Sequence, residues 1–181
     1  MTLPRLMLVD DEPHVLQSLQ RLLRRHFPEQ ACRIELFADP VKALERSKDA
    51  AFAVVISDFR MPGMDGIALL KAIKAVQPDA MRLILSATAD RSVLIDAINE
   101  AEILRFIAKP WDDGEVVEAV RQALSRHDQL QDDRRLADEL RVRKGVMTPQ
   151  EEELRRLEEE EPGITKVNWG PDGSVILGDP E

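Results

Sequence analysis

The sequence is poor in cysteine and in aromatic residues. Cys32 is the only cysteine among 181 residues, so neither an intrachain disulfide nor a metal cage built from cysteines can form. Tyrosine is absent and aromatic residues make up 4% of the chain, so aliphatic side chains must fill the core. Hydrophobic residues nevertheless make up 44%, which is enough for one well-filled core in an ordinary domain with an appendage.

The sequence also lacks any hydrophobic run of about 18 residues, the length that a membrane-spanning helix needs. The first residues lead straight into a strand-like segment and do not form a secretion signal. We therefore expect a cytoplasmic protein that does not use a membrane as a partner.

Basic residues are scarce in the C-terminal part, where the net charge of −9 is concentrated. Residues 1–111 carry 15 acidic and 15 basic side chains, whereas residues 112–161 carry 16 acidic and 9 basic ones. An acidic tail repels polyanions, so we do not expect nucleic acid as a partner.

Short apolar runs alternate with stretches of helical periodicity over the first 111 residues. The runs are Leu6–Val9, Ile34–Phe37, Val54–Ile56, Leu83–Leu85 and Phe106–Ile107. Nearly continuous apolar strands are typical of a parallel sheet that is covered on both faces. Strands that alternate with helices form βαβ units, so the pattern predicts an α/β fold with a doubly wound, five-stranded parallel sheet. Functional residues of such folds lie at the carboxyl ends of the strands.

Beyond the sheet, the sequence predicts a helical extension. A helix should begin near Asp113 and continue to about Lys144, which is longer than covering the sheet requires. The capping box Thr148–Glu151 predicts a second, short helix. Segments 164–169 and 174–177 flank a Gly/Pro/Asp/Gly turn and predict a β-hairpin.

These signals divide the chain into a domain of residues 1–126 and a helical extension with a terminal hairpin, residues 127–181. Polar residues occupy many of the positions that would form a coiled-coil seam beyond Leu124. Two alternatives therefore stay open for the long helix: a coiled-coil homodimer, or a helix that is solvated on every side.

Polar residues with complementary chemistry follow four of the predicted strands: Asp10 and Asp11, Asp58, Ser86 and Thr88, and Lys109. Three carboxylates at one edge repel one another unless a cation lies among them, and carboxylate and water oxygens suit Mg²⁺. Lys109 adds an ammonium group that suits phosphate oxygens. A cation, an ammonium, a hydroxyl and a free carboxylate are what in-line phosphoryl transfer to an aspartate requires.

Three segments, 8–13, 55–66 and 106–111, resemble the signature segments of response-regulator receiver domains, which have a flavodoxin-like fold. The resemblance covers about residues 4–126, with the segments in order and at suitable separations. It implies that Asp58 is the phosphoacceptor. It also implies that Asp10, Asp11 and Asp58 hold Mg²⁺ together with the main-chain carbonyl of Arg60.

The resemblance implies roles for further residues. Lys109 would pair with Asp58 or its phosphoryl group, with a cis bond to the proline that follows. Ser86 would be the hydroxyl that closes on the phosphoryl oxygen; Thr88 competes for this role, but Ser86 ends the strand. Phe106 would be an aromatic switch that turns when Ser86 moves, although a core aromatic residue needs no such role.

Arg60 and Thr88 would flank the site and tune the access of water to the acyl phosphate. Arg60 departs in size and charge from the small residues that are frequent at its position in the family.

Together these features predict a phosphorelay response regulator and not an enzyme. A histidine kinase or phosphotransfer protein would donate to Asp58, and the tail would signal to a downstream protein or change the assembly state. One alternative is a non-signalling scaffold with the same fold. The other is a phosphatase with Asp58 as its nucleophile, although residues 59–62 offer no second acid/base aspartate.

Overall fold

The computed structural model describes residues 3–87, 101–160 and 162. Two sequence predictions lie outside these ranges: the role of Thr88 and the hairpin at residues 164–177.

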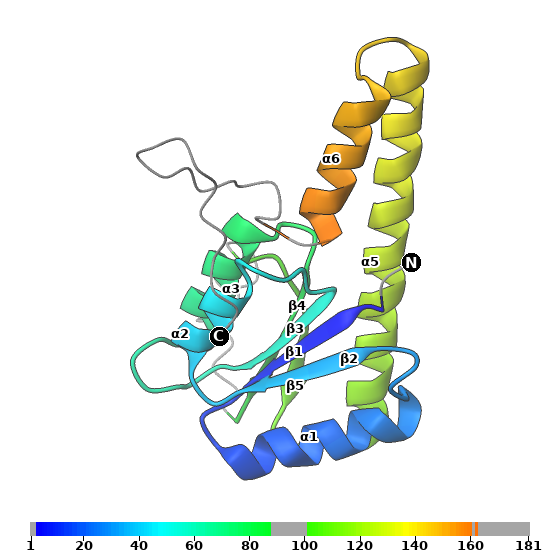
Figure 1. Ribbon diagram of the computed structural model, residues 1–181. Coiled ribbons are helices and arrows are strands. Elements are labelled where there is room, and N and C mark those ends of the chain that lie inside the picture. Colours follow the sequence, from blue (N-terminus) through cyan, green and yellow to red (C-terminus); the bar gives the residue numbers. More distant parts are fainter. Residues whose placement is uncertain (1–2, 88–100, 161, 163–181) are drawn as a thin grey trace.

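Five parallel strands form one sheet in the order β2-β1-β3-β4-β5 (Figure 1). The strands are β1 (Arg5–Val9), β2 (Arg33–Phe37), β3 (Val54–Asp58), β4 (Met81–Ser86) and β5 (Ile103–Ala108). The predicted five-stranded parallel sheet is confirmed. The strand order reverses between β1 and β3, and the crevice at the carboxyl ends of such a strand pair is where doubly wound folds place their sites.

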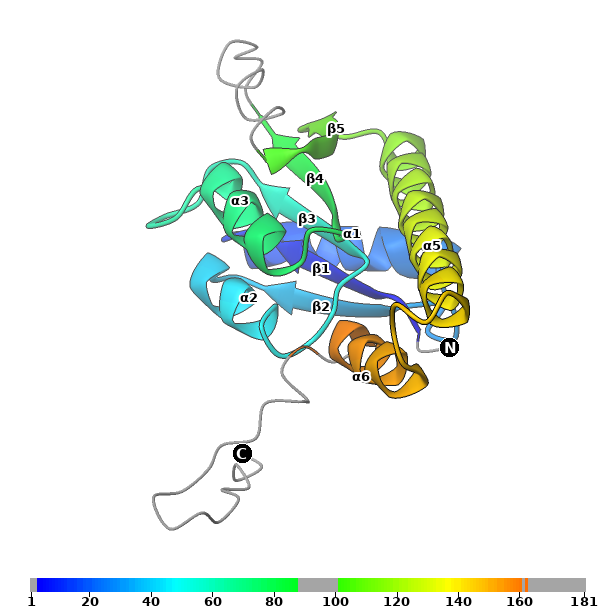
Figure 2. The same cartoon turned by 90° about the horizontal axis from the view of Figure 1, so that it is seen from above.

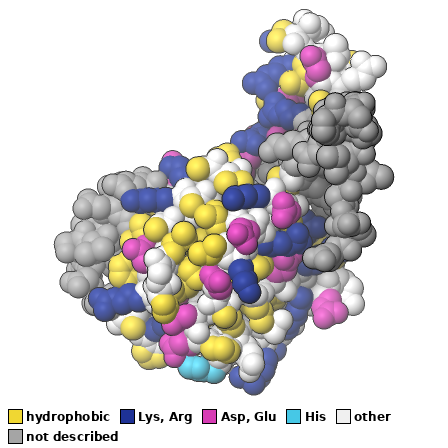
Figure 3. Space-filling view, turned by 60° about the vertical axis from the view of Figure 1, so that its left-hand side comes forward, with side chains coloured by type: hydrophobic (Ala, Val, Ile, Leu, Met, Phe, Trp, Pro, Cys, Tyr) yellow, Lys and Arg dark blue, Asp and Glu magenta, His cyan; other side chains and the backbone are white. Residues whose placement is uncertain are grey.

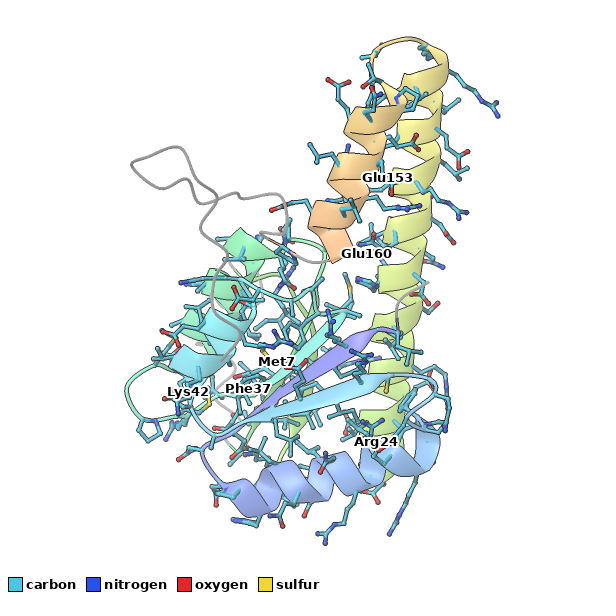
Figure 4. The ribbon with its side chains drawn as sticks, viewed as in Figure 1. Met7, Arg24, Phe37, Lys42, Glu153 and Glu160 are labelled. Carbon is cyan, nitrogen blue, oxygen red and sulfur yellow. The ribbon has the colours of Figure 1, made fainter. Side chains whose placement is uncertain are left out.

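Helices cover both faces of the sheet (Figure 2). Helices α1 (Pro13–His26) and α5 (Asp113–Arg143) pack on one face, whereas α2 (Pro40–Arg46) and α3 (Gly66–Val76) pack on the other. Because successive strand residues point to opposite faces, Leu6 and Leu8 of β1 join the first apolar cluster and Met7 joins the second. Phe37, labelled with Met7 in Figure 4, packs in the same layer as Met7.

Aspartate side chains fix where three of the helices begin. Asp39 accepts a hydrogen bond from the main-chain N–H of Val41 at the start of α2, and Asp65 accepts one from Ala68 at the start of α3. Asp112 does the same for α5. These contacts satisfy N–H groups that a helix leaves unpaired in its first turn.

The C-terminal extension forms a helical arm, defined here as residues 127–160. Helix α5 projects beyond the sheet, and α6 (Pro149–Glu160) runs back along it in the opposite direction (Figure 1). The predicted long and short helices are confirmed. Gly145 adopts a φ of 68° in the connection, a left-handed conformation that glycine adopts without strain. Thr148 and Glu151 form the predicted reciprocal capping box at the start of α6.

Among the described residues, no helix combines the length and the apolar character that crossing a membrane requires.

At the amino-terminal edge of the sheet, a buried arginine ties β4 to β5. The side chain of Arg82 is 3% exposed. Its guanidinium donates hydrogen bonds to the main-chain carbonyls of Pro78 (3.1 Å), Ala80 (2.6 Å) and Ala101 (2.7 Å). Glu102 adds an ion pair at 3.4 Å. One side chain therefore satisfies three carbonyl groups that the strand ladder leaves without a partner.

We predict that Arg82→Met lowers the free energy of unfolding by about 3 kcal/mol, because it leaves buried carbonyls unsatisfied. Arg121→Met is the matched control, since Arg121 is exposed and pairs with the exposed Glu118. The control should change the free energy by no more than about 0.5 kcal/mol. Urea denaturation followed by circular dichroism measures both, and equal effects would contradict the prediction.

Candidate functional site

Three charged side chains from distant parts of the chain meet at the carboxyl edge of the sheet. Asp10 follows β1, Asp58 ends β3, and Lys109 follows β5. The Nζ atom of Lys109 lies 2.7 Å from Oδ2 of Asp10 and 2.5 Å from Oδ1 of Asp58. Parallel strands end at the same edge, which is why residues so far apart in the sequence come into contact.

Main-chain N–H groups hold the other oxygen of each carboxylate. Oδ1 of Asp10 accepts a hydrogen bond from the N–H of Glu12 (2.9 Å), and Oδ2 of Asp58 accepts one from the N–H of Arg60 (2.7 Å). Asp10 is 1% exposed and Asp58 is 6% exposed. Both carboxylates are therefore buried and fixed in orientation, with one partner for each oxygen.

Burial and the neighbouring charges have opposing effects on the pKa values of Asp10 and Lys109. Burial raises the pKa of Asp10, and the hydrogen bonds from Lys109 and from the N–H of Glu12 oppose this rise without cancelling it. Burial alone would lower the pKa of Lys109, but its hydrogen bonds to Asp10 and Asp58 and their negative charge raise it above its usual value. Lys109 therefore stays a charged ammonium at neutral pH.

The predicted switch residues lie on the two strands beside this cluster. Ser86 ends β4 and is 3% exposed, and its main-chain carbonyl accepts a hydrogen bond from the N–H of Lys109 (2.8 Å). Phe106 lies on β5, is partly buried, and packs against the apolar cluster on the α2 and α3 side. The peptide bond between Lys109 and Pro110 is cis, as the resemblance implied.

The donor set at this edge bears on the predicted Mg²⁺ site. Asp10 and Asp58 each direct one oxygen at the same ammonium nitrogen, so the two carboxylates lie within reach of a single cation. Carboxylate oxygens are the ligands that Mg²⁺ prefers. Asp11 and the side chain of Arg60 are exposed. Within the described ranges, no three His, Cys, Asp or Glu side chains gather closely enough to hold a metal ion.

These two carboxylates fit a shared hard cation. The participation of Asp11 and of the Arg60 carbonyl stays a prediction.

Gly66, the first residue of α3, is a site residue to which the sequence analysis gave no role. A Cβ atom at this position would lie 2.0 Å from the carbonyl oxygen of Asp58 and 3.0 Å from Oγ of Ser57. The N–H of Gly66 donates to the carbonyl of Phe59 (2.9 Å), and the Ser57 hydroxyl donates to the carbonyl of Asp58 (2.9 Å). The only signal in the sequence was a poor helix former directly after the helix cap Asp65.

We predict that Gly66→Ala lowers the free energy of unfolding by about 2 kcal/mol or more, because the added methyl group overlaps the backbone of Asp58. The control is Gly114→Ala in the first turn of α5, where the nearest atom is the capping side-chain oxygen of Asp112 at 3.0 Å, so this variant should lose no more than about 1 kcal/mol. Chemical denaturation compares the two variants. A Gly66 variant as stable as the control would show that this close approach is not required.

Comparison with known proteins identifies one family. Residues 6–121 match the family described as response regulator receiver domain. The chain is similar to the chemotaxis protein CheY of Bacillus subtilis, with 32% identity over 121 residues that cover 67% of this chain and 98% of that protein.

Longer regulators are also similar over the same region. The hydrogenase transcriptional regulatory protein HoxA of Bradyrhizobium diazoefficiens is 34% identical over 119 residues, which are 66% of this chain and 24% of that protein. HoxA of Cupriavidus necator is 32% identical over 78% of this chain and 28% of that protein. The chain thus spans about a quarter of the length of these two relatives.

A solved structure agrees with the sequence comparisons. The signal receiver domain of an HD domain-containing protein from Pseudomonas fluorescens Pf-5 superimposes with a TM-score of 0.65 at 35% identity, covering 71% of this chain and 99% of that one.

Proposed function

The chain belongs to the response regulator receiver family and continues into a C-terminal helical region, and from this premise we propose that Asp58 accepts a phosphoryl group from a histidine kinase or a phosphotransfer protein. The observation that carries the proposal is the contact of one ammonium, Lys109, with two buried carboxylates, Asp10 and Asp58. A receiver domain of a two-component response regulator implies such a kinase as partner.

In the proposed reaction, an oxygen of the Asp58 carboxylate attacks phosphorus and forms the acyl phosphate bond. The bond from phosphorus to the donor's histidine nitrogen breaks, and that nitrogen keeps the electron pair. The N–H of Arg60 orients the carboxylate for attack. Lys109 neutralises charge on the phosphoryl oxygens. Asp10, Asp11, Asp58 and the main-chain carbonyl of Arg60 would hold Mg²⁺, which would supply further positive charge at the site.

Phosphorylation changes what Lys109 contacts. The phosphoryl group carries a charge of about −1.5 to −2 and brings new acceptor oxygens, so it competes for the ammonium that now bridges Asp10 and Asp58. Ser86 ends the adjacent strand and would close on a phosphoryl oxygen, with Phe106 turning inward as the switch. The main-chain N–H of Lys109 donates a hydrogen bond to the Ser86 carbonyl and so couples the ends of β4 and β5. This coupling supports a joint movement of the two strand ends.

Other residues at the rim tune the site. The exposed side chain of Arg60 and the predicted neighbour Thr88 would control how readily water reaches the acyl phosphate.

The arm would carry the output, through contact with a downstream protein or a change of assembly. Its exposed leucines support this role.

We predict that acetyl phosphate and Mg²⁺ add one phosphoryl group to the full chain, as measured by intact mass. Asp58→Asn removes the acceptor and abolishes the mass gain, and a chelator that removes Mg²⁺ abolishes it in the unaltered chain. Asp65→Asn is the matched control, since this aspartate lies in the same segment but caps α3. The control should be labelled to the same extent as the unaltered chain.

Two other outcomes would contradict the proposal. No labelling of the unaltered chain would leave a scaffold with a receiver fold. Turnover of several phosphate esters, lost in Asp58→Asn, would indicate a phosphatase.

A further inference from the structure

The two helices of the arm contact each other through charged side chains. Arg155 of α6 pairs with Asp138 of α5 at 2.8 Å, and Arg134 of α5 lies 3.5 Å from Glu159 of α6. Arg134 also pairs with Asp79, in the connection between α3 and β4. No residue of α6 is buried. The interior of this helix pair is therefore polar.

Two leucines of α5, Leu136 and Leu140, point away from α6. Leu136 is 53% exposed and Leu140 is 54% exposed. Each lies two positions from Asp138, which faces α6, and two positions correspond to about 200° of helical rotation. These leucines thus lie on the side of α5 opposite α6. On the arm, at the upper right of Figure 3, hydrophobic and basic side chains are exposed side by side.

Charged residues of opposite sign flank the two leucines. Asp132 and Asp133 precede them, and Arg143 and Lys144 follow them. Asp133, Leu136, Leu140 and Arg143 are spaced by three, four and three residues, as in the seam between two paired helices. We call these four residues the back of α5. Within the described part of the chain, Asp133, Arg143 and Lys144 form no ion pair, and all three are exposed.

We propose that the back of α5 binds the same surface of a second copy of this chain, with the two helices antiparallel and the two-fold axis near residue 138. This inference rests on the proposed role of the arm in output. Under this symmetry, Leu136 packs on the partner's Leu140, and each such contact occurs twice. The flanking charges on the back of α5 then meet their opposites, because Asp133 meets the partner's Arg143.

Charge complementarity favours a second copy in this orientation. The back of α5 is acidic at one end and basic at the other. It is therefore complementary to a second copy of itself that runs in the opposite direction. A parallel pair would place Asp133 against the partner's Asp133 and Arg143 against the partner's Arg143. Like charges that face each other between helices oppose association. Burying the two leucines from each copy supplies the attraction, and the charges select the orientation.

Charge reversal tests the interface in the full chain by analytical ultracentrifugation. We expect the unaltered chain to dimerise. Asp133→Lys and Arg143→Glu should each raise the dissociation constant by about tenfold or more, because each reversal creates two repulsive pairs per dimer. An equimolar mixture of the two variants should recover the original affinity, since each chain then meets its complement. Glu153→Lys on α6, labelled in Figure 4, is the control and should change little.

A monomeric unaltered chain, or a mixture that fails to recover affinity, would overturn the interface.

Disulfide trapping tests the register. A mixture of Leu136→Cys and Leu140→Cys chains should form a cross-linked heterodimer in higher yield than either variant alone. Cys32 is buried and should not compete. Leu154→Cys on α6 is the exposed control and should cross-link poorly. Preferred cross-linking of Leu136→Cys to itself would indicate parallel helices and overturn the proposed orientation.

Labelling by acetyl phosphate separates this inference from the proposed function. If Asp58 is labelled but the unaltered chain stays monomeric with and without the phosphoryl group, the interface fails and the receiver function stands. If the charge-reversed mixture recovers affinity but Asp58 is never labelled, the interface stands and the receiver function fails.

Discussion

The contact of Lys109 with Asp10 and Asp58 is the interaction on which the site depends. Two carboxylates buried side by side repel each other, and each also loses hydration. One ammonium offsets both costs, and two main-chain N–H groups satisfy the oxygens that it does not reach. Because the three residues come from the ends of β1, β3 and β5, the same contact also fixes these strand ends relative to one another. A phosphoryl group on Asp58 would therefore disturb several elements together.

The arm is held by interactions of a different kind. Its helices meet through ion pairs between partly exposed side chains, and such pairs typically contribute about 0.2–1 kcal/mol each. The sheet-facing part of α5, in contrast, buries apolar side chains from Val116 to Ala123 against the core. Helix α6 is thus fixed far less firmly than the start of α5. Local opening of α6 should therefore cost less free energy than opening of the start of α5.

The sequence allowed most of the fold and the centre of the site to be predicted, because both follow from patterns along the chain. Apolar runs located the strands, and their parallel arrangement placed Asp10, Asp58 and Lys109 at one edge. Gly66 was missed because its contribution is the absence of a side chain, which becomes meaningful only when the backbone of Asp58 lies beside it. The polar contact between α5 and α6 was also not predicted. The spacing of the leucines indicates an apolar stripe but not whether the neighbouring helix covers it.

Helix α5 connects the site to the arm without interruption. It begins at Asp113, four residues after Lys109, and extends as one helix to Arg143. Arg134 pairs with Asp79, which precedes β4 and therefore lies at the opposite edge of the sheet from Asp58. The helix is thus attached near the site, along the sheet through its apolar face, and again at the far edge. Close-packed interfaces shift between discrete arrangements and do not deform continuously. A displacement of Lys109 would accordingly move α5 as a unit, and the exposed leucines beyond Arg134 are where that movement would reach a partner.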